Sequence, residues 1–313
     1  MELNKEILDF LLSKGIIHDT VTSSGHSVVV AHNSKCRSVS IVPAPIIADC
    51  LEAAAKYTES LSSCINHITS TYGGRPLIIS EDRWRHQGEM TKARLLAHLE
   101  IFTQIYARNC EVRKIDKKTA AEFLEANHSY GDASCRYRYG LYLKRHTGHN
   151  AGSVSIEPGC LVAVATFSNG RKWIKGDKTI RSYEWTRYAS LPGVRLSGGM
   201  GRLLKAFIAE VKPDDIMTYA DLEWSEGKVY EALGFTLEGH KSPVLFCIDT
   251  YNWSRKHITS DGPWFPLTPA AGLRQLMHPL AGDGMSTPTI GPSDCRYFQN
   301  FGSNKYRLKL TEY

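Results

Sequence analysis

A glycine-rich turn that leads into an amphipathic helix constrains the fold of this chain more than any other feature. The turn reads Arg195-Leu-Ser-Gly-Gly-Met-Gly201, and residues 202–210 after it have helical spacing. A short apolar run at 216–220 then predicts a strand. Glycines let backbone N–H groups approach a phosphate, and the helix adds its free N-terminal N–H groups. The segment therefore predicts a phosphate-binding turn, with a tight packing turn as the alternative.

The same segment carries polar side chains that suit a phosphate. Arg195 and Arg202 are candidates for charge-assisted bonds to a pyrophosphate or a 3′-phosphate, and Ser197 is a candidate for a helix cap or a phosphate contact. The turn lacks the Gly-Lys-Ser/Thr ending of a P-loop. It also does not fit a dinucleotide fingerprint, which needs an acidic residue ending a second strand roughly 20 residues on.

Composition and net charge limit the classes of protein to which this chain can belong. The 313 residues suffice for roughly two domains, and 42% hydrophobic with 22% charged residues is typical of a globular chain. The sequence has no apolar run of the ~18 residues that span a bilayer, and its first residues lack a signal-peptide pattern. We therefore expect a soluble, cytoplasmic protein with no membrane partner. The formal charge of +6 permits a nucleic-acid partner without requiring one.

The cysteines argue against a metal site and against a disulfide framework. None of the eight forms a CxxC pair; they stand at positions 36, 50, 64, 110, 135, 160, 247 and 295. Without a secretory signal, we expect most of them to be reduced and partly buried. Their spacing with histidine does not suit zinc, so no metal is predicted.

Hydrophobic periodicity predicts a mixed organisation of helices and strands in two regions. Residues 1–110 are expected to form an α/β region, with helices at 4–13, 46–70 and 81–107 and strands at 28–31, 39–42 and 77–79. Residues 111–313 are expected to form a second domain, with a helix at 117–126 and strands at 112–115, 139–143, 161–167, 181–188, 235–238 and 245–248.

The remaining segments of the second domain are expected to be more irregular. Residues 146–159 read as a long hairpin loop. A Pro- and Gly-rich stretch over 260–292 reads as loop, interrupted by a short helix at 270–277. A last strand is expected over 297–310, with a turn at 301–305.

The glycine turn and the segment after it resemble the GNAT superfamily of acyl-CoA N-acyltransferases. The coenzyme A motif of that family reads Arg/Gln-x-x-Gly-x-Gly/Ala; Arg195 and Gly198 match its first two fixed positions, whereas Met200 departs at the last. The segment Val229-Tyr-Glu-Ala-Leu-Gly-Phe235 resembles the family's Leu-Tyr-x-x-x-Gly-Phe motif. The resemblance covers roughly 110–250. It implies a mixed, mostly antiparallel central sheet flanked by helices.

The resemblance also implies a reaction and a donor site. The reaction is the transfer of an acyl group, acetyl above all, from coenzyme A to an amine. Tyr230 takes the role of general acid toward the departing thiolate, and the edge of residues 188–191 supplies a backbone N–H group for the thioester carbonyl. The residues expected to hold the coenzyme are Tyr188, Ser190, Leu191, Arg195, Ser197, Gly198, Gly199, Met200, Gly201 and Arg202.

Acidic residues near the cleft are the candidates for the remaining chemistry. Glu184, on the strand before the turn, is the first candidate for the base, with an ion pair to Arg187 as the alternative. Asp221 is a further catalytic candidate and Glu223 a candidate for binding the acceptor, with helix capping as the alternative for both. Arg187 is a candidate for holding an anionic acceptor. Trp224, like Trp185, is a candidate for stacking on a base or on adenine, with packing in the core as the alternative that we favour for at least one of the two.

A narrower resemblance is to a phage and mobile-element branch that includes Mom-like DNA-modification proteins. It rests on 161–167, 183–188, 198–200 and 218–225. Residues 80–84 and 105–111 resemble the linker to a nuclease in such fusions, although 1–75 lack an Asp…Glu-x-Lys set. The alternatives to acyl transfer are therefore DNA base modification and a non-catalytic DNA-binding module. Basic and aromatic residues over 296–309 suit nucleic acid or, as we favour, a charged edge strand.

Overall fold

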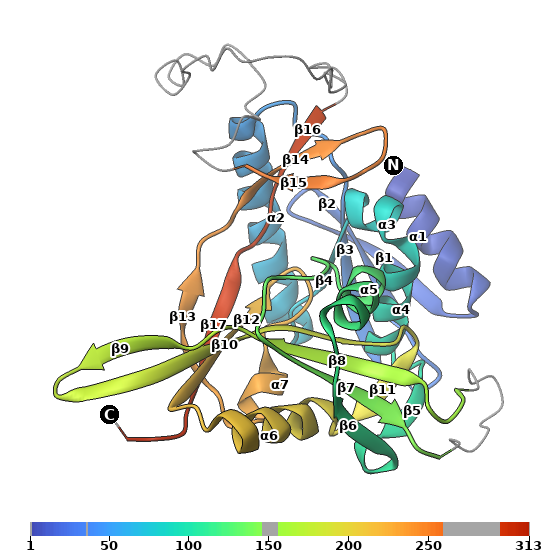
Figure 1. Cartoon of the computed structure of the whole chain (residues 1–313). Coiled ribbons are helices and arrows are strands. Elements are labelled where there is room, and N and C mark those ends of the chain that lie inside the picture. Colours follow the sequence, from blue (N-terminus) through green and yellow to red (C-terminus); the bar gives the residue numbers. More distant parts are fainter. Residues whose placement is uncertain (1, 36, 146–155, 259–294, 313) are drawn as a thin grey trace, which may run out of the picture. The chain divides into compact units, whose positions relative to one another are not determined.

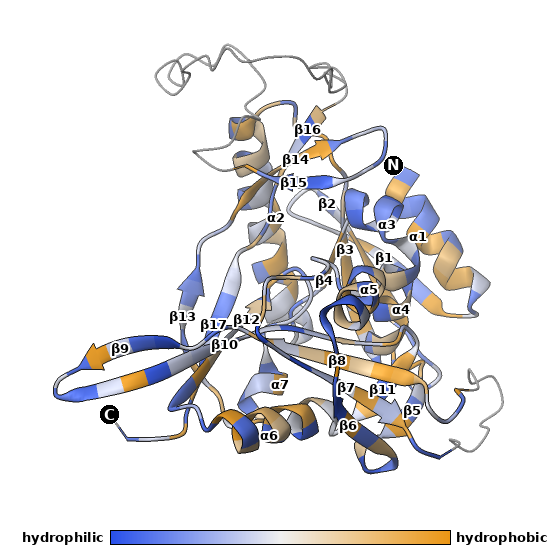
Figure 2. Cartoon of the chain, viewed as in Figure 1, coloured by the Kyte–Doolittle hydropathy of each residue, from blue (hydrophilic) through white to orange (hydrophobic). Residues whose placement is uncertain are grey.

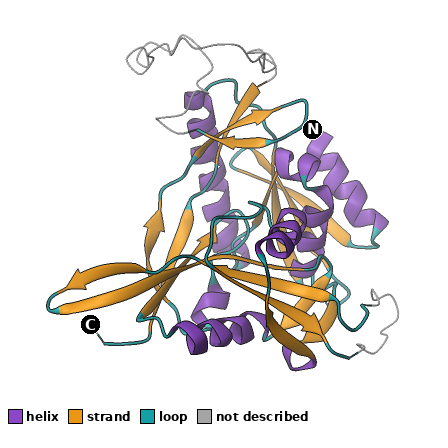
Figure 3. Cartoon of the chain, viewed as in Figure 1, coloured by secondary structure: helices purple, strands orange, loops and turns teal. Residues whose placement is uncertain are grey.

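The computed structural model describes residues 2–35, 37–145, 156–258 and 295–312, whose helices and strands are drawn in Figures 1 and 3. The chain divides into two compact units. Unit 1 comprises Met1–Ala31, Ser40–His86 and Ser242–Gly302, and unit 2 comprises His32–Val39, Gln87–Lys241 and Ser303–Tyr313. This division differs from the boundary expected at residue 110. The expected loop and short helix at 260–292 lie outside the described residues, as does most of the hairpin loop expected at 146–159.

The first part of unit 1 is a four-stranded sheet with helices. Its elements are α1 (Glu2–Ser13), β1 (Ile17–Ser23), β2 (His26–His32), β3 (Ser38–Ala44), α2 (Leu51–Tyr72), β4 (Leu77–Ser80) and α3 (Glu81–His86), with the strand order β1-β2-β3-β4. The long helix α2 ends at Gly73, whose φ of 74° lies in the left-handed region that favours glycine. The helix expected over 46–70 therefore forms, but it begins at Leu51 and ends at Tyr72.

The second part of unit 1 comes from a segment far along the chain. The strands β14 (Leu245–Asp249), β15 (Arg255–His257) and β16 (Cys295–Gln299) form a sheet of order β15-β14-β16. The Thr58 hydroxyl of α2 donates to the Gln299 carbonyl at 2.7 Å, which ties the two parts together. The single strand expected over 297–310 is therefore wrong: β16 ends at Gln299, and β17 begins at Ser303 in another sheet.

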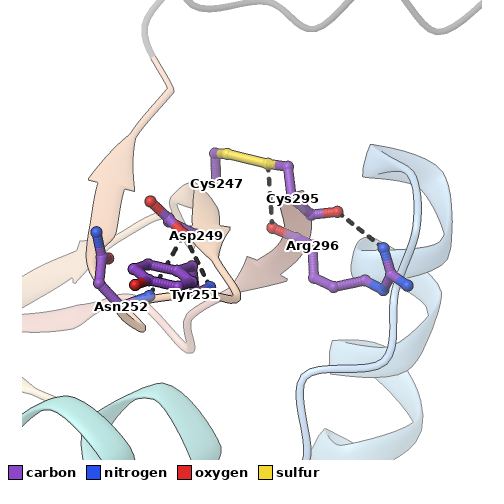
Figure 4. Close-up of a disulfide and its surroundings, with 6 residues drawn as sticks. All are labelled: Cys247, Asp249, Tyr251, Asn252, Cys295 and Arg296. Atoms are coloured by element: carbon purple, nitrogen blue, oxygen red, sulfur yellow. Dashed lines mark hydrogen bonds between the residues drawn. A yellow bond between two sulfur atoms is a disulfide. The ribbon is translucent and has the colours of Figure 1, made fainter. Parts of the chain in front are cut away.

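A disulfide joins two of the strands in this second part (Figure 4). It links Cys247 of β14 to Cys295 of β16, which are 48 residues apart in sequence. The expectation of reduced cysteines is wrong for this pair, because strand pairing brings together two cysteines whose spacing gave no signal. Five others are free and at least partly buried, as expected: Cys50, Cys64, Cys110, Cys135 and Cys160.

Buried charges connect the two parts of unit 1. The Arg255 guanidinium donates to both Asp82 carboxylate oxygens, at 2.6 and 3.0 Å, and to the Ser80 hydroxyl. Its side chain is 6% exposed and that of Asp82 only 1%. Burial alone would raise the pKa of Asp82, but the charge and hydrogen bonds of Arg255 outweigh it and hold that pKa below its ordinary value. The rings of Phe246 and Phe298 lie 5.0 and 4.9 Å from the guanidinium.

Unit 2 contains the glycine turn and a larger sheet. Its elements are α4 (Gly88–His98), β5 (Thr103–Tyr106), a 3₁₀ turn (Ala107–Asn109), β6 (Cys110–Lys114), α5 (Lys117–Asn127), β7 (Tyr137–Leu143), β8 (Leu161–Phe167), β9 (Arg171–Lys175), β10 (Lys178–Ser190), β11 (Val194–Ser197), α6 (Gly199–Val211), β12 (Asp215–Asp221), α7 (Lys228–Glu231), β13 (Thr236–Lys241) and β17 (Ser303–Lys309). The helix expected over 81–107 breaks after His86 and ends at His98, and a strand follows it.

The sheet of unit 2 has the order β13-β17-β12-β10-β8-β7-β6, and β9 pairs with β10. Among these described strands, only β10 and β12 pair in parallel, and the other pairings are antiparallel. The predicted fold class, a mixed and mostly antiparallel sheet flanked by helices, is confirmed. Because β17 lies between β12 and β13, the reading of 296–309 as an edge strand is wrong for 303–309, whereas β16 does lie at the end of the order β15-β14-β16.

Helices cover both faces of this sheet. Along β8, Ala163, Ala165 and Phe167 pack in one cluster with α6, whereas Val164 packs with α5 on the other face. The ring of Phe167 stacks on Phe207 of α6, with centroids 3.9 Å apart. A strand buried on both faces explains the nearly continuous apolar run over 161–167. Within the described residues, none of the helices is long and apolar enough to cross a membrane.

We expect Arg255→Met to lower the free energy of unfolding of unit 1 by about 3–5 kcal/mol, because Asp82 would keep a buried and poorly compensated charge. The double variant Asp82→Asn/Arg255→Met should recover a large part of that loss. Urea unfolding checks both, with Lys256→Met on the exposed side of β15 as the control. A loss below about 1 kcal/mol for Arg255→Met would show that Asp82 does not depend on this partner.

Candidate functional site

The strands β10 and β12 pair over a short distance and then diverge. The parallel contact joins Ser182 to Asp215, Tyr183 to Ile216 and Glu184 to Met217. Beyond it, β10 continues against β8 through Ser190, and β12 continues against β17 through Asp221. We call this point of divergence, at the carboxyl ends of the only parallel pair in the described sheet, the opening. Ligands of open sheets bind at such ends.

Backbone donors of β10 line one side of this opening. The Leu191 N–H group donates to the Val162 carbonyl of β8 at 3.0 Å, so it is not available to a ligand. Because successive N–H groups along a strand point to opposite edges, those of Tyr188 and Ser190 point away from β8. Of the predicted segment 188–191, these two residues present the donors to the opening.

The glycine turn lies against Tyr188 at the start of α6. Gly198 precedes the helix with a φ of 75°, and no side chain caps the helix. A Cβ on Gly199 would lie 2.7 Å from the Leu196 side chain and 3.2 Å from the Tyr188 hydroxyl. Only glycine therefore lets the turn come this close to β10. The first N–H groups of α6 have no intrahelical acceptors, which keeps them available to a ligand oxygen.

The polar side chains of the turn contact the segment 102–107. The Arg195 guanidinium lies 5.2 Å from the Phe102 ring, and Arg202 donates to the Ala107 carbonyl at 3.1 Å. The Ser197 hydroxyl accepts a hydrogen bond from Gln104 at 2.7 Å. These residues fasten the turn to β5 and the 3₁₀ turn, a role the sequence did not indicate. Their contribution to binding a phosphate stays a prediction.

The residue that departs from the coenzyme motif has a packing role. Met200 is partly buried against the core cluster under α6. Gly201 lies close to Leu233, whose side chain would be 3.2 Å from a Cβ at this position. Met200 therefore packs against the core, and Gly201 leaves space for Leu233 in the segment after α7.

Two tyrosine hydroxyls lie near the opening. The Tyr230 ring packs among those of Trp185, Phe235 and Tyr306, with centroids 5.6 to 6.1 Å away. Burial raises the pKa of Tyr230, against the opposite effect of a hydrogen bond with Thr218. Burial also raises the pKa of Tyr188, and the neighbouring Tyr230 adds to this. Both phenols are therefore protonated at neutral pH.

Sequence reasoning missed two members of this group. It assigned Tyr188 only a backbone role, although its hydroxyl lies between the glycine turn and Tyr230. It did not single out Thr218, which is 2% exposed and donates to the Trp185 carbonyl at 3.1 Å across the parallel pair. The alternation of side chains along β10 and β12 shows which residues share a face of the sheet, but it does not tell which face packs against α6.

Glu184 lines a cavity of about 350 Å³ on the other face of the sheet, together with Ser182, Met217 and Tyr219. Asp221 lies four residues beyond Met217 on the same face of β12, or roughly 13 Å along the strand. Its carboxylate accepts the Glu223 N–H group at 3.0 Å, which closes a turn after β12; the N-cap of α7 is Gly227, so Asp221 does not cap that helix. The structure therefore does not bring Glu184 and Asp221 together.

The three predicted acceptor-binding residues are buried or bonded within unit 2. Glu223 is fully buried, and Trp224 is 9% exposed with the Arg94 guanidinium 5.2 Å from its ring. Arg187 donates to the Gly131 and Thr186 carbonyls at 3.1 and 2.9 Å. Burial lowers the pKa of Arg187, and the nearby Glu184 acts in the opposite direction. Among the residues that the structure describes, no three His, Cys, Asp or Glu side chains gather as a metal site.

An ionic network borders the cavity next to Glu184. Arg307 donates to Asp215 and to Glu238, at 2.7 Å each, and Ser182 donates to the same Asp215 carboxylate. Lys305 forms a second ion pair with Glu238 at 2.7 Å. The hydrogen bond from Arg307, with further help from Lys305, lowers the pKa of Glu238 to about 2. The network fixes β13, β17, β12 and β10 to one another beside the cavity.

Two known protein structures resemble less than half of this chain, at low sequence identity. No protein-family model and no curated protein matches the sequence. Eis1 from Mycobacterium abscessus matches 45% of this chain and 34% of its own, at 14% identity and a TM-score of 0.31. A conserved protein of unknown function from Enterococcus faecalis V583, described as a probable N-acyltransferase, matches 46% and 36% at 14% identity and a TM-score of 0.28. The chain thus covers about a third of each. Neither comparison bears on the phage branch.

We expect Glu238→Gln to make the acid limb of the stability curve shallower. The folded pKa of Glu238 lies below its ordinary 4.5, so its contribution is present above that pH and is lost as the pH falls toward 2. The variant should be less stable than the parent at pH 7, and the two should converge near pH 2. Urea midpoints across this range measure the effect, with the exposed Glu312→Gln as a charge-matched control. Parallel curves for the variant and the parent would contradict the expectation.

Proposed function

We propose that unit 2 is an acyl-CoA-dependent N-acyltransferase, with acetyl-CoA as the donor and an amine as the acceptor. One observation carries this proposal: β10 and β12 diverge after Glu184 and Met217, and the glycine turn before α6 lies so close to Tyr188 that a Cβ on Gly199 would be 3.2 Å from its hydroxyl. This arrangement gathers backbone donors for a phosphate, backbone donors for a carbonyl and two protonated phenols around one region of the sheet.

The donor fits the opening by charge and hydrogen bonding. The N-terminus of α6, over 199–201, offers N–H groups without intrahelical acceptors and the positive end of the helix dipole to the pyrophosphate, whereas the Arg202 N–H group is bonded to the Gly198 carbonyl. The N–H groups of Tyr188 and Ser190 would donate to the thioester carbonyl oxygen, on which negative charge develops during attack.

The reaction then needs two proton transfers. The amine nitrogen attacks the carbonyl carbon, the carbon–sulfur bond breaks, and the amide product and a thiolate result. Tyr230, protonated at neutral pH, gives its proton to the thiolate, and Glu184 takes the proton that the amine loses. The two residues lie on opposite faces of the sheet, one on each side of the opening, so that the donor separates acid from base. Asp221, which caps the turn after β12, has no part in this scheme.

Binding of the donor is tested first. Acetyl-CoA at 100 times its dissociation constant should stabilise the protein by about 2.7 kcal/mol, measured as a shift of the thermal unfolding midpoint. Desulfo-coenzyme A should give a comparable shift, because the helix N-terminus binds the pyrophosphate rather than the acyl group. No shift with either ligand at millimolar concentration would overturn the proposal.

We expect Tyr230→Phe to reduce kcat for acetyl transfer to a reactive primary amine by about 100-fold or more, with the acetyl-CoA thermal shift retained. The variant loses a proton donor but keeps the aromatic packing with Trp185 and Phe235. Release of free coenzyme A measures the rate. Tyr251→Phe, at a tyrosine that is 93% exposed, is the matched control. Loss of activity in Tyr188→Phe with full activity in Tyr230→Phe would contradict this assignment and make Tyr188 the donor.

A further inference from the structure

The hairpin formed by β9 and the start of β10 projects beyond the other strands of its sheet (Figure 1). We call residues 171–182 the ribbon. It carries the cations Arg171, Lys172, Lys175, Lys178 and Arg181 against one acid, Asp177. All five residues of β9 are exposed, with Trp173 at 52% and Ile174 at 83%. Figure 2 shows the resulting mixture of hydrophilic and hydrophobic stretches along the ribbon.

Strand pairing within the ribbon places like charges opposite one another. Lys175 lies directly across from Lys178, and Lys172 lies directly across from Arg181. Directly opposed like charges destabilise an antiparallel pair, by amounts similar to the ~0.2–1 kcal/mol that opposite charges contribute. The Arg181 guanidinium forms an ion pair with Asp214, and the Lys178 ammonium donates to the Glu312 carbonyl. An anion bound across such a pair would remove the repulsion.

One face of the ribbon continues into the cavity next to Glu184. Arg171, Trp173 and Lys175 share that face by alternation, and all three line the cavity. Lys305 and Arg307 of β17 line its other side, where both form ion pairs with Glu238 and Arg307 also pairs with Asp215, so the excess of positive charge comes from the ribbon. Asp215 already receives hydrogen bonds from Arg307 and Ser182. The surface from the ribbon tip to β17 is therefore a cationic groove, which we call the basic groove.

Aromatic rings stand at intervals within the basic groove. Trp173 presents its exposed ring from β9, and Tyr219 lines the cavity from β12. The Lys241 ammonium lies 5.4 Å from the centre of the Tyr219 ring. Proteins that bind single-stranded nucleic acid use a positively charged groove to contact the phosphates and aromatic side chains on which the bases stack. The cavity, at about 350 Å³, has room for a base that leaves the stack.

We propose that the basic groove binds single-stranded nucleic acid, with the ribbon cations on phosphates and Trp173 stacked on a base. The inference goes beyond acyl transfer and does not depend on it, because it uses neither the glycine turn nor Tyr230. An acidic protein is the other class of partner that the charge would admit. The exposed Trp173 between cations favours the nucleic acid, since every base offers a face for stacking.

The test uses a fluorescein-labelled oligothymidylate of about 20 nucleotides, with binding to the full chain followed by anisotropy. If about four phosphates are contacted, affinity should fall about fifty-fold between about 50 and about 200 mM salt. Trp173→Ala should weaken binding by roughly 5- to 150-fold, the loss of one stacked base, and Trp173→Phe should restore part of it.

Charge reversal separates binding from folding. Lys175→Glu/Lys178→Glu keeps two like charges opposed, so the thermal midpoint should stay near that of the parent while binding weakens by more than about tenfold. Lys117→Glu/Lys118→Glu on α5 makes the same change in net charge at two exposed positions and should leave binding within about twofold. The single variant Lys175→Glu creates an opposed pair of unlike charges. It should therefore raise the midpoint and still weaken binding.

Two results would overturn the proposal. One is equal binding by the parent and by Lys175→Glu/Lys178→Glu, which would show that the ribbon does not contact the oligonucleotide. The other is binding of poly-aspartate as tight as that of the oligonucleotide at the same salt, with no effect of Trp173→Ala, which would assign the basic groove to an acidic protein. The acetyl-CoA thermal shift, measured on the same variants, should be unchanged, so failure of this inference and failure of acyl transfer are distinguishable.

Discussion

The short parallel contact between β10 and β12 is the constraint on which the rest of unit 2 depends. A parallel pair cannot be closed by a tight turn, so the chain must cross over between the two strands, and α6 provides that crossover. The contact covers only three residue pairs before β10 follows β8 and β12 follows β17. An opening results at the point where the crossover helix begins. The backbone hydrogen bonds of β10 with β8 and of β12 with β17 hold the two strands apart at this point.

The two faces of this sheet supply different chemistry. On the α6 face, burial keeps the phenols of Tyr188 and Tyr230 protonated, close to an aromatic core that excludes water. On the other face, Glu184 shares a cavity with the cations of the ribbon and of β17. The phenols and the Glu184 carboxylate therefore lie on different faces of the sheet. The basic groove lies on the face of Glu184, away from the phenols.

Much of the local structure followed from the sequence, and the reasons for the exceptions are physical. The helices α2, α5 and α6 and the buried strand β8 carry strong periodic or continuous apolar patterns, and they form where predicted. The strand β9 was missed because its residues are exposed and mostly charged, so it has no buried face to create a pattern. The segment 297–310 was read as one strand because the break at 300–302 depends on Asn300, whose side chain accepts N–H groups from Val244 and Gly302.

The sequence by itself determined the strand–helix–strand unit around the glycine turn, the buried strands of the sheet and the residue types at its opening. Periodicity and glycine conformation are local, so they can be read without knowing the partners. Only the tertiary structure decided that Arg195, Ser197 and Arg202 fasten the turn to 102–107, that Leu191 is already bonded, and that Asp221 lies far from Glu184. Each of these depends on which strand edges meet, and long-range pairing leaves no trace in the spacing of residues along one chain.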